Sequence, residues 1–481
     1  MSNARPNVLL ITTDQQRFDA MRLHGNAVIH TPNLDALAVG GVDFTRAYIT
    51  CPVCIPARRT LMSGLHPSTH GLQHYEDGLE WSPTRTLPQC LRDAGYQTEL
   101  VGKLHLAPQR KRYGFEHMVL CESATRRIGA EHLCESDWCD WLDRETGGRH
   151  PSSHGLDGNG RLARPWHLDE VYHHTNFIAD RAIDFIERRR DPSCPWFLHL
   201  SFVAPHPPLC PPAVYFDRYK DRPDLAPLMG DWASKAEPRP GISPTAAVGP
   251  FPRDEIQRAM AGYYGLVEHV DAQIGHFLQK CFEYSSRRAR EPLWILFSSD
   301  HGEMLGDHHL FRKSLGYEGA AHVPFFITGR NLDVPSGTCD ALVGWEDVMP
   351  TILDLAGVPV PPGLDGSSLV PLMRGEAGAP RETIFGCCGP HHFLVQGLLK
   401  YILHGKTGEE QVFDLGNDPG ELHDLSADSA VLHPLRSAML RHLRETRDAA
   451  SVPSEDQLAP CGNRPPTAFW PSAEDRRGCV R

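Results

Sequence analysis

Short apolar runs that contain β-branched residues recur along the first two thirds of the chain. The clearest are Asn7–Thr13, Trp196–Val203 and Pro292–Ser299. Each run has no polar side, which is typical of a strand buried on both faces in a parallel sheet. Longer amphipathic segments lie between them, such as 171–190 and 254–284, and these predict helices. The alternation predicts an α/β fold with a central, mostly parallel sheet flanked by helices.

The pattern changes after about residue 380, where several short strand-like runs precede one helical segment at 430–447. The runs are Thr383–Cys387, Phe393–Val395, Lys400–Leu403 and Glu410–Asp414. We therefore expect a large α/β domain over 1–375 and a small C-terminal α+β subdomain over 376–447. The remaining stretch, 448–481, is rich in proline and polar residues, so we expect disorder or an arm that contacts another subunit.

Two long polar regions, 107–170 and 209–253, show no clear periodicity. We interpret them as irregular loops inserted between the strands and helices. Loops of this kind usually carry substrate specificity, because they vary while the framework stays fixed.

Polar side chains stand directly after two of the buried runs. Asp14 and Gln15 follow the first, and Asp300 and His301 follow the third. Because ligands collect at the carboxyl ends of parallel strands, we expect these four side chains to meet at one edge of the sheet. Carboxylate and amide oxygens suit a hard divalent cation, and the imidazole widens the choice toward manganese. Taken alone, Asp14 could equally cap the next helix.

Further candidate residues follow the other strands. His206 comes after the second run and lies between prolines, which stiffen the loop and leave the imidazole displayed. Lys103 and His105 follow a predicted strand at 97–101 and alternate along the chain, so both can point the same way. Each of these residues, considered alone, is also compatible with an ordinary surface position.

The most informative segment is Cys54-Ile-Pro-Ala-Arg58, a Cys-x-Pro-x-Arg pentad. Pro56 favours a first helical turn and Gly64 is a plausible stop, so the pentad predicts a helix that starts beside Cys54. The free N–H groups at a helix start favour an anion there. The competing interpretation is an inert buried cysteine, which is the commoner case for this residue type.

Composition excludes several classes of protein. The 481 residues exceed what one hydrophobic core usually supports, and the formal charge of -12 argues against general nucleic-acid binding. The 14 cysteines show no paired zinc spacing. We found no signal peptide and no apolar run of membrane-spanning length, so we expect a cytoplasmic protein with reduced thiols and no membrane partner.

Taken together, these segments resemble the type I sulfatases of the alkaline-phosphatase superfamily over roughly residues 7–425. The resemblance rests on Asn7–Gln15, on the Cys54–Gly64 signature, on Gly102–His105 and on Ser298–Lys313. It implies that a formylglycine-generating enzyme oxidises Cys54 to Cα-formylglycine. It also implies one divalent ion, held by Asp14, Gln15, Cys54, Asp300 and His301.

The same resemblance implies roles for five further side chains. Arg58 would orient the hydrated aldehyde, and Lys103 and Lys313 would neutralise the anionic oxygens of the substrate. His105 would help collapse the intermediate, and His206 would protonate the leaving group. The chemistry fits, because a gem-diol can attack the sulfur with one hydroxyl and then expel sulfate through the other.

The metal-binding pairs here are Asp-Gln and Asp-His, whereas the family more often has two carboxylates first and asparagine at position 301. This departure resembles the choline-sulfatase and phosphonate monoester hydrolase branch and leaves calcium, manganese and magnesium open. The leading hypothesis is a hydrolase of small aryl or alkyl sulfate esters. The alternatives are a phosphonate monoester or phosphodiester hydrolase, a non-catalytic binding protein on this scaffold and, more weakly, a dithiol role for Cys51 and Cys54. We also expect a homo-oligomer.

Overall fold

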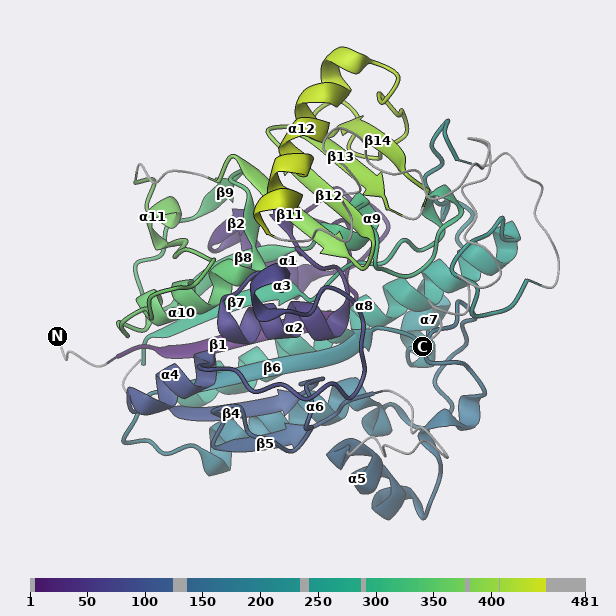
Figure 1. The fold of residues 1–481 in the computed structure, drawn as a ribbon. Helices are drawn as coiled ribbons and strands as arrows, with labels where there is room; N and C mark the ends of the chain where they lie inside the picture. The colour runs from purple at the N-terminus through teal and green to yellow at the C-terminus, as the bar shows by residue number, and fades with distance from the viewer. Residues whose placement is uncertain are drawn as a thin grey trace.

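An eight-stranded sheet forms the centre of the computed structural model, which describes residues 5–123, 136–233, 242–286, 291–376, 381–405 and 407–446 (Figure 1). The strand order is β5-β4-β6-β1-β7-β8-β2-β9. Their bounds are β1 (Asn7–Asp14), β2 (Val42–Phe44), β4 (Gln97–Gly102), β5 (His117–Leu120), β6 (Trp196–Pro205), β7 (Leu293–Ser299), β8 (Phe325–Arg330) and β9 (Gly337–Cys339). Only β8 of these strands runs antiparallel to its neighbours, so the predicted mostly parallel sheet is confirmed.

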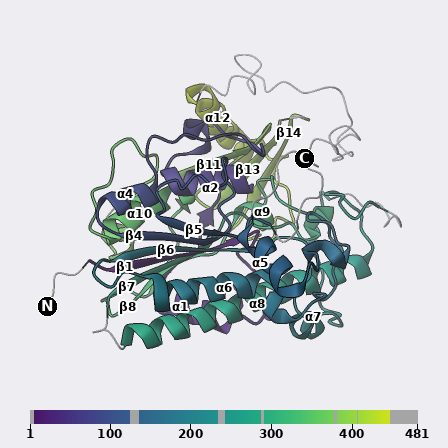
Figure 2. The same cartoon turned by 90° about the horizontal axis from the view of Figure 1, so that it is seen from below.

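Helices cover both faces of this sheet, as Figure 2 shows. Those on one face are α1 (Pro32–Val39), α6 (His174–Asp184), α7 (Ala213–Tyr219) and α8 (Arg253–Ser286). Those on the other face are α2 (Cys54–Ser63), α4 (Leu87–Asp93) and α10 (Val348–Leu355). The side chains of β1 divide between the two cores: Leu9 and Ile11 pack on the α8 side, and Val8 and Leu10 on the α2 side. Burial on both faces explains why the middle of this strand, Val8–Ile11, is entirely apolar.

Helix α2 has the limits that its sequence predicts. It starts at Cys54, and the chain leaves it at Gly64, which adopts a left-handed conformation with φ 68°. Glycine is favoured there because a side chain would be strained at positive φ. All ten residues of α2 are buried, so the helix is fixed in the interior rather than laid on the surface.

A second, antiparallel sheet forms the C-terminal part of the described chain. Its four strands are β11 (Thr383–Cys388), β12 (His391–Gln396), β13 (Leu399–His404) and β14 (Glu409–Asp414), and helix α12 (Ser429–Glu445) packs on it. Leu394 and Tyr401 lie in the core under α12. Phe393 and Ile402, on the opposite face, pack with Tyr317 of the large sheet's loops. The subdomain is therefore α+β, as the sequence predicts.

A buried lysine joins the two parts of the protein. Lys400 of β13 is completely buried and pairs with Glu318 and, at 3.0 Å, with Glu421. Glu318 begins the short helix α9 (Glu318–Ala321), which lies in the segment between β7 and β8 of the large sheet. A buried charge left without its partners is very costly, so these three residues hold the subdomain in place.

The interpretation of 107–170 as irregular loops is wrong in part. Strand β5 belongs to the large sheet, and helix α5 (Asp137–Thr146) follows it. With four residues and a polar start, β5 lacks the apolar run that marked the other strands. The region 209–253 likewise contains α7. Residues 124–135, 234–241 and the predicted tail 448–481 lie outside the described residues.

The other described elements are β3 (Ala47–Tyr48), β10 (Val343–Gly344), α3 (Pro67–His70), α11 (Val370–Met373), single turns at Pro151–His154, Glu170–Tyr172, Asp307–His309 and Trp345–Asp347, and a π-helical turn at Phe185–Arg189. Among the helices that the structure describes, none has both the length and the apolar character needed to span a membrane.

Candidate active site

Four neighbouring parallel strands end at one edge of the large sheet, and each is followed by residues singled out from the sequence. The strands, in order across the sheet, are β4, β6, β1 and β7. The residues that they deliver, in the same order, are Lys103 and His105, His206, Asp14 and Gln15, and Asp300 and His301. Parallel strands bring their carboxyl ends together, so this edge collects residues from very different parts of the chain.

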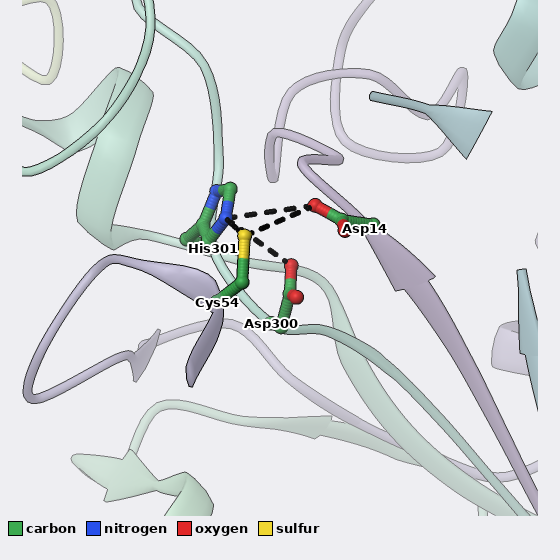
Figure 3. Close-up of side chains that lie close together, drawn as sticks. All are labelled: Asp14, Cys54, Asp300 and His301. Carbon is green, nitrogen blue, oxygen red and sulfur yellow. Dashed lines mark hydrogen bonds and ion pairs between the residues drawn. The ribbon is translucent and has the colours of Figure 1, made fainter. Parts of the chain in front are cut away.

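Asp14, Cys54, Asp300 and His301 form a buried cluster at this edge (Figure 3). One potential ligand atom from each lies within 4.8 Å of the others. His301 Nε2 is 3.1 Å from Cys54 Sγ, and 3.6 and 3.5 Å from carboxylate oxygens of Asp14 and Asp300. The structure therefore brings together four of the five side chains that the sequence suggests as metal ligands.

The imidazole of His301 is turned so that Nε2 faces the cluster. Its Nδ1 is 2.9 Å from the carbonyl oxygen of Gly302, and a carbonyl can only accept, so Nδ1 carries a proton. Burial lowers the pKa of His301, but the Asp300 carboxylate and Cys54 together outweigh it and the net pKa is raised. These neighbours thus favour a positive charge at the imidazole.

Arg58 fixes helix α2 to the sheet edge. Its Nε donates to Asp300 Oδ2 at 2.9 Å, and its NH1 donates to the Lys103 carbonyl at 2.8 Å and to Ser201 Oγ at 3.1 Å. The remaining nitrogen, NH2, is buried, has no hydrogen-bond partner among the described residues and lies 3.9 Å from Asp14 Oδ2. That nitrogen is left as a donor directed at the cluster.

Two lysines add positive charge next to Cys54. Lys103 is buried and forms an ion pair with Asp14. Lys313 is partly exposed, and its Nζ donates to Gln15 Oε1 at 2.7 Å and lies 3.3 Å from Cys54 Sγ. The two ammonium groups approach the thiol from different parts of the chain, Lys103 from the end of β4 and Lys313 from the loop before α9, which is suited to binding an anion between them.

The lysines also decide the ionisation of the acidic groups. Burial raises the pKa of the Asp14 carboxyl, but Lys103 and other nearby positive groups outweigh it and hold the pKa well below its ordinary value. Burial and Asp14 likewise raise the pKa of the Cys54 thiol, yet Lys313 and Lys103 bring the net pKa below the usual value for cysteine. The site therefore stabilises negative charge at position 54.

Gln15 has a backbone conformation that few residues adopt, with φ 75°. Its N–H donates to Asp300 Oδ1 at 3.1 Å, and its carbonyl accepts from the Tyr263 hydroxyl at 2.6 Å. Its side-chain amide lies between Glu303 and Lys313. Its predicted role as a metal ligand stays a prediction.

His105 lies beside Lys103 and is held by its backbone. Its N–H donates to Glu122 Oε2 at 2.8 Å, and the N–H of Leu104 donates to the other oxygen of the same carboxylate at 3.2 Å. The ring nitrogen Nδ1 is buried and has no hydrogen-bond partner in the described part of the chain. Burial, together with Lys103, holds the pKa of His105 well below its ordinary value, so the imidazole is neutral.

His206 stands at the end of β6 with its ring orientation fixed. Nδ1 donates to the carbonyl of Pro207 at 2.7 Å, which leaves Nε2 for another partner. Burial and the positive charge of Lys313 hold the pKa of His206 well below its ordinary value, although Asp14 opposes them. The imidazole is accordingly neutral until an anion offsets the lysines.

Sequence reasoning missed four residues that support this site: Ser201, Glu122, Tyr263 and Glu303. Ser201 is one of two polar residues, with His199, in the run Trp196–Val203, and Glu303 follows Asp300-His301-Gly302 directly, so both left a signal in the sequence. Glu122 and Tyr263 left none, because they lie in a polar region and in a long helix.

Two protein families match this chain, and together their matches span nearly all of the described residues. Residues 6–358 match the family described as Sulfatase, and residues 306–449 match that described as "N-sulphoglucosamine sulphohydrolase, C-terminal". The chain belongs to the sulfatase family. Family membership agrees with the resemblance read from the sequence, and this sulfatase is a hydrolase.

Individual relatives support the same assignment. An arylsulfatase of Clostridium perfringens is 40% identical over 438 residues, which cover 88% of this chain and 90% of that one. A choline-sulfatase of Rhizobium meliloti is 29% identical over 465 residues, or 93% and 87% of the two chains. Among solved structures, the phosphonate monoester hydrolase of Agrobacterium radiobacter has a TM-score of 0.71 at 24% identity and covers 96% of this chain and 100% of its own, so it shares the fold.

Proposed function

We propose that this sulfatase hydrolyses small aryl or alkyl sulfate esters, using one divalent metal ion and a Cα-formylglycine made from Cys54. The observation that supports this most directly is the position of Cys54. It begins a buried helix, lies 3.1 Å from His301 Nε2 and is flanked by Lys103 and Lys313. An inert structural cysteine has no need of two lysines and a metal-type donor set around it.

The donor set fits a divalent ion. Two buried carboxylates, Asp14 and Asp300, and the Nε2 of His301 converge, and Asp300 and Cys54 raise the pKa of His301 in spite of its burial. Oxygen donors with one imidazole suit calcium, manganese or magnesium. Asp14, Asp300, His301 and residue 54 would hold the ion, with Gln15 as the fifth candidate. A hydrated formylglycine supplies the attacking hydroxyl and a second hydroxyl for sulfate release, while the ion supplies Lewis acidity.

The chain's cations would bind the sulfate group. Lys103, Lys313 and the unpaired NH2 of Arg58 face the same space from three different elements. Their charges are already fixed by Asp14, Gln15 and Asp300, so little reorganisation is needed when the ester arrives. Arg58 keeps residue 54 aligned by tying α2 to the end of β7.

His206 would protonate the leaving oxygen. Its pKa is low because burial and Lys313 disfavour the imidazolium. A bound sulfate ester brings negative charge next to those lysines and thereby raises the pKa of His206 toward neutrality. Nδ1 is occupied by Pro207, so Nε2 is the atom that would deliver the proton. His105, whose pKa is lowered by burial and by the same cations, would take up a proton during release.

A phosphonate monoester or phosphodiester is the second candidate substrate class. These esters present the same tetrahedral anionic centre. The site also departs from the family's commoner residues, because Gln15 stands where a carboxylate is usual and His301 where an asparagine is usual.

We further propose that a formylglycine-generating enzyme acts on Cys54, that the protein is a cytoplasmic homo-oligomer, and that the large and small domains divide near residue 375.

Two measurements test this function. Mass spectrometry of the peptide around Cys54 should find sulfur replaced by oxygen with loss of two hydrogens. Comparison of kcat/KM for nitrophenyl sulfate, a phenylphosphonate ester and a phosphodiester should favour the sulfate. Cys54→Ala should abolish turnover, whereas Cys51→Ala, three residues earlier in the same buried segment, should keep both the modification and activity. Full activity with an unmodified Cys54 thiol would rule the proposal out.

A further inference from the structure

Glu303 lies three residues beyond Asp300, and its buried carboxylate contacts two separate parts of the site. One oxygen, Oε2, accepts from the side-chain amide of Gln15. The other, Oε1, accepts from the backbone N–H of Leu305 at 3.0 Å and from the backbone N–H of Arg312. One carboxylate therefore holds a side chain at the end of β1 and the loop that carries Lys313.

The contacts of Gln15 leave one possible orientation for its amide. A carboxylate only accepts hydrogen bonds, so the group that faces Glu303 must be the NH2. An ammonium only donates, so the group that faces Lys313 Nζ, 2.7 Å away, must be the oxygen. A reversed amide would place two acceptors together at Glu303 and two donors together at Lys313. Both ends of the amide thus select the same orientation.

The backbone around these contacts is held in a strained form. Arg312 and Ser314, on either side of Lys313, have φ of 72° and 74°, and Gln15 has φ 75°. Such conformations persist only where the surroundings enforce them. Glu303 supplies part of that enforcement through the N–H of Arg312, and Ser314 donates its N–H to the Pro52 carbonyl at 2.9 Å. The loop is thereby anchored on both sides of the lysine.

We propose that Glu303 is a positioning residue, which fixes the amide of Gln15 with its oxygen toward Lys313 and holds the Lys313 loop against the site. This role rests on the proposed function, because it specifies how the side of the site next to residue 54 is built. An amide oxygen is a usable ligand for a hard cation, whereas an amide NH2 is not, so the orientation set by Glu303 decides whether Gln15 can serve the site at all.

A double-mutant cycle tests the role of this pair. Glu303→Gln keeps an oxygen for the Leu305 and Arg312 N–H groups but presents NH2 to Gln15, which forces that amide to reverse. Gln15→Glu alone places two carboxylates together. In the double variant Q15E/E303Q, the amide NH2 of residue 303 faces the carboxylate of residue 15. A donor therefore faces an acceptor again, with the two roles exchanged. Q15E/E303M has the same net charge as this double variant but lacks the amide donor, so it serves as the charge-matched control.

Each single variant should lower the affinity for Ca²⁺ or Mn²⁺ by about tenfold or more and kcat/KM for nitrophenyl sulfate by about 100-fold. Q15E/E303Q should recover to within about threefold of the wild type in ion affinity, and Q15E/E303M should not. Glu268→Gln, a change to a buried glutamate of α8 that accepts from Tyr219 at 2.7 Å, should leave both quantities unchanged. Titration calorimetry and steady-state kinetics supply the measurements.

The proposal is overturned if E303Q keeps wild-type ion affinity and turnover, or if the double variant is no better than the single ones. Melting temperatures measured in EDTA report the Gln15–Glu303 coupling without ion or substrate, and the double variant should melt above both singles. A wild-type protein that binds neither ion and hydrolyses no ester would refute the proposed function instead, while the melting-temperature cycle would still decide whether the pair is coupled.

Discussion

Arg58 and Asp300 form a buried ion pair, with 2.9 Å between Nε and Oδ2, although 242 positions separate them in the chain. The pair joins the first turns of α2 to the end of β7. Cys54 begins the same helix, so this contact fixes the position of the candidate nucleophile relative to the metal-type cluster. Both side chains are almost completely buried, which makes the pair sensitive to the loss of either partner.

Replacement of Arg58 by methionine should therefore destabilise the protein as well as inactivate it. The change leaves Asp300 buried without its cation, and broken buried pairs typically cost about 3–5 kcal/mol. Urea unfolding would measure the loss. Arg59→Met is the matched control, because the neighbouring arginine donates to the Leu79 carbonyl and lies over the Trp81 ring, and its loss should cost about 1 kcal/mol. Equal losses for the two variants would contradict the role given to Arg58.

The two lysines should separate stability from catalysis. Lys103→Met removes the buried partner of Asp14 and should reduce both the free energy of unfolding and kcat/KM. Lys313→Met affects a partly exposed group, so it should reduce kcat/KM by roughly 10²–10³-fold with a small change in stability. Kinetics and urea unfolding of both variants give the comparison. A large stability loss in Lys313→Met alone would reverse this assignment.

Removal of divalent ions should lower stability without unfolding the protein. In the absence of an ion, Arg58 and Lys103 still balance the charges of Asp300 and Asp14. Saturation with an ion at 100 times its Kd should raise the free energy of unfolding by about 2.7 kcal/mol over the value in EDTA. Calorimetric melting with Ca²⁺, Mn²⁺ and Mg²⁺ would also rank the three ions. Asp14→Asn should abolish the difference, and persistence of the full effect in that variant would place the ion elsewhere.

Acid should destabilise the fold through buried neutral histidines. Burial lowers the pKa of His174 and of His269 to about 3. Their folded pKa lies below the ordinary value near 6.5, so the unfolded chain binds the extra protons and stability falls as the pH drops below about 6.5. Each histidine contributes on the order of 1.4 kcal/mol per pH unit until about pH 3.

His269→Gln tests this pH dependence, because glutamine can still bond to Asn176, which lies 2.8 Å from Nε2 in the wild type. The free energy of unfolding, measured at pH 7, 5.5 and 4.5, should fall less steeply with decreasing pH in the variant. The difference in slope should correspond to about one bound proton. His74→Gln, at a side chain that is 57% exposed, should leave the slope unchanged. An unchanged slope in His269→Gln would show that this residue titrates normally.

The sequence predicted those site residues that stand at the ends of strands or at the start of a helix. Asp14 and Asp300 follow apolar strands, and parallel strands share an edge, so their meeting could be foreseen. Cys54 could be placed at a helix start because Pro56 and Gly64 mark the ends of α2. The short strand β5 was missed, since four residues with a polar start carry too little pattern.

The supporting contacts could not be predicted, because they depend on loop conformation. Glu122 and Glu303 bind backbone N–H groups in turns that contain residues at positive φ, such as His105 and Arg312. No periodic pattern encodes such turns. Tyr263 reaches the Gln15 carbonyl from the long helix α8, where an aromatic residue is normally read as core.

The placement of Lys400 bears on how the protein can be shortened or split. A chain that ends before β11 would lack this lysine, and Glu318 would remain beside an apolar surface once covered by Phe393 and Ile402. Since Glu318 opens the short helix after the Lys313 loop, the loss would reach the substrate-binding side of the large sheet. Engineers who seek a minimal version of this enzyme must therefore keep both sheets on one polypeptide or supply the second as a fragment that reassociates.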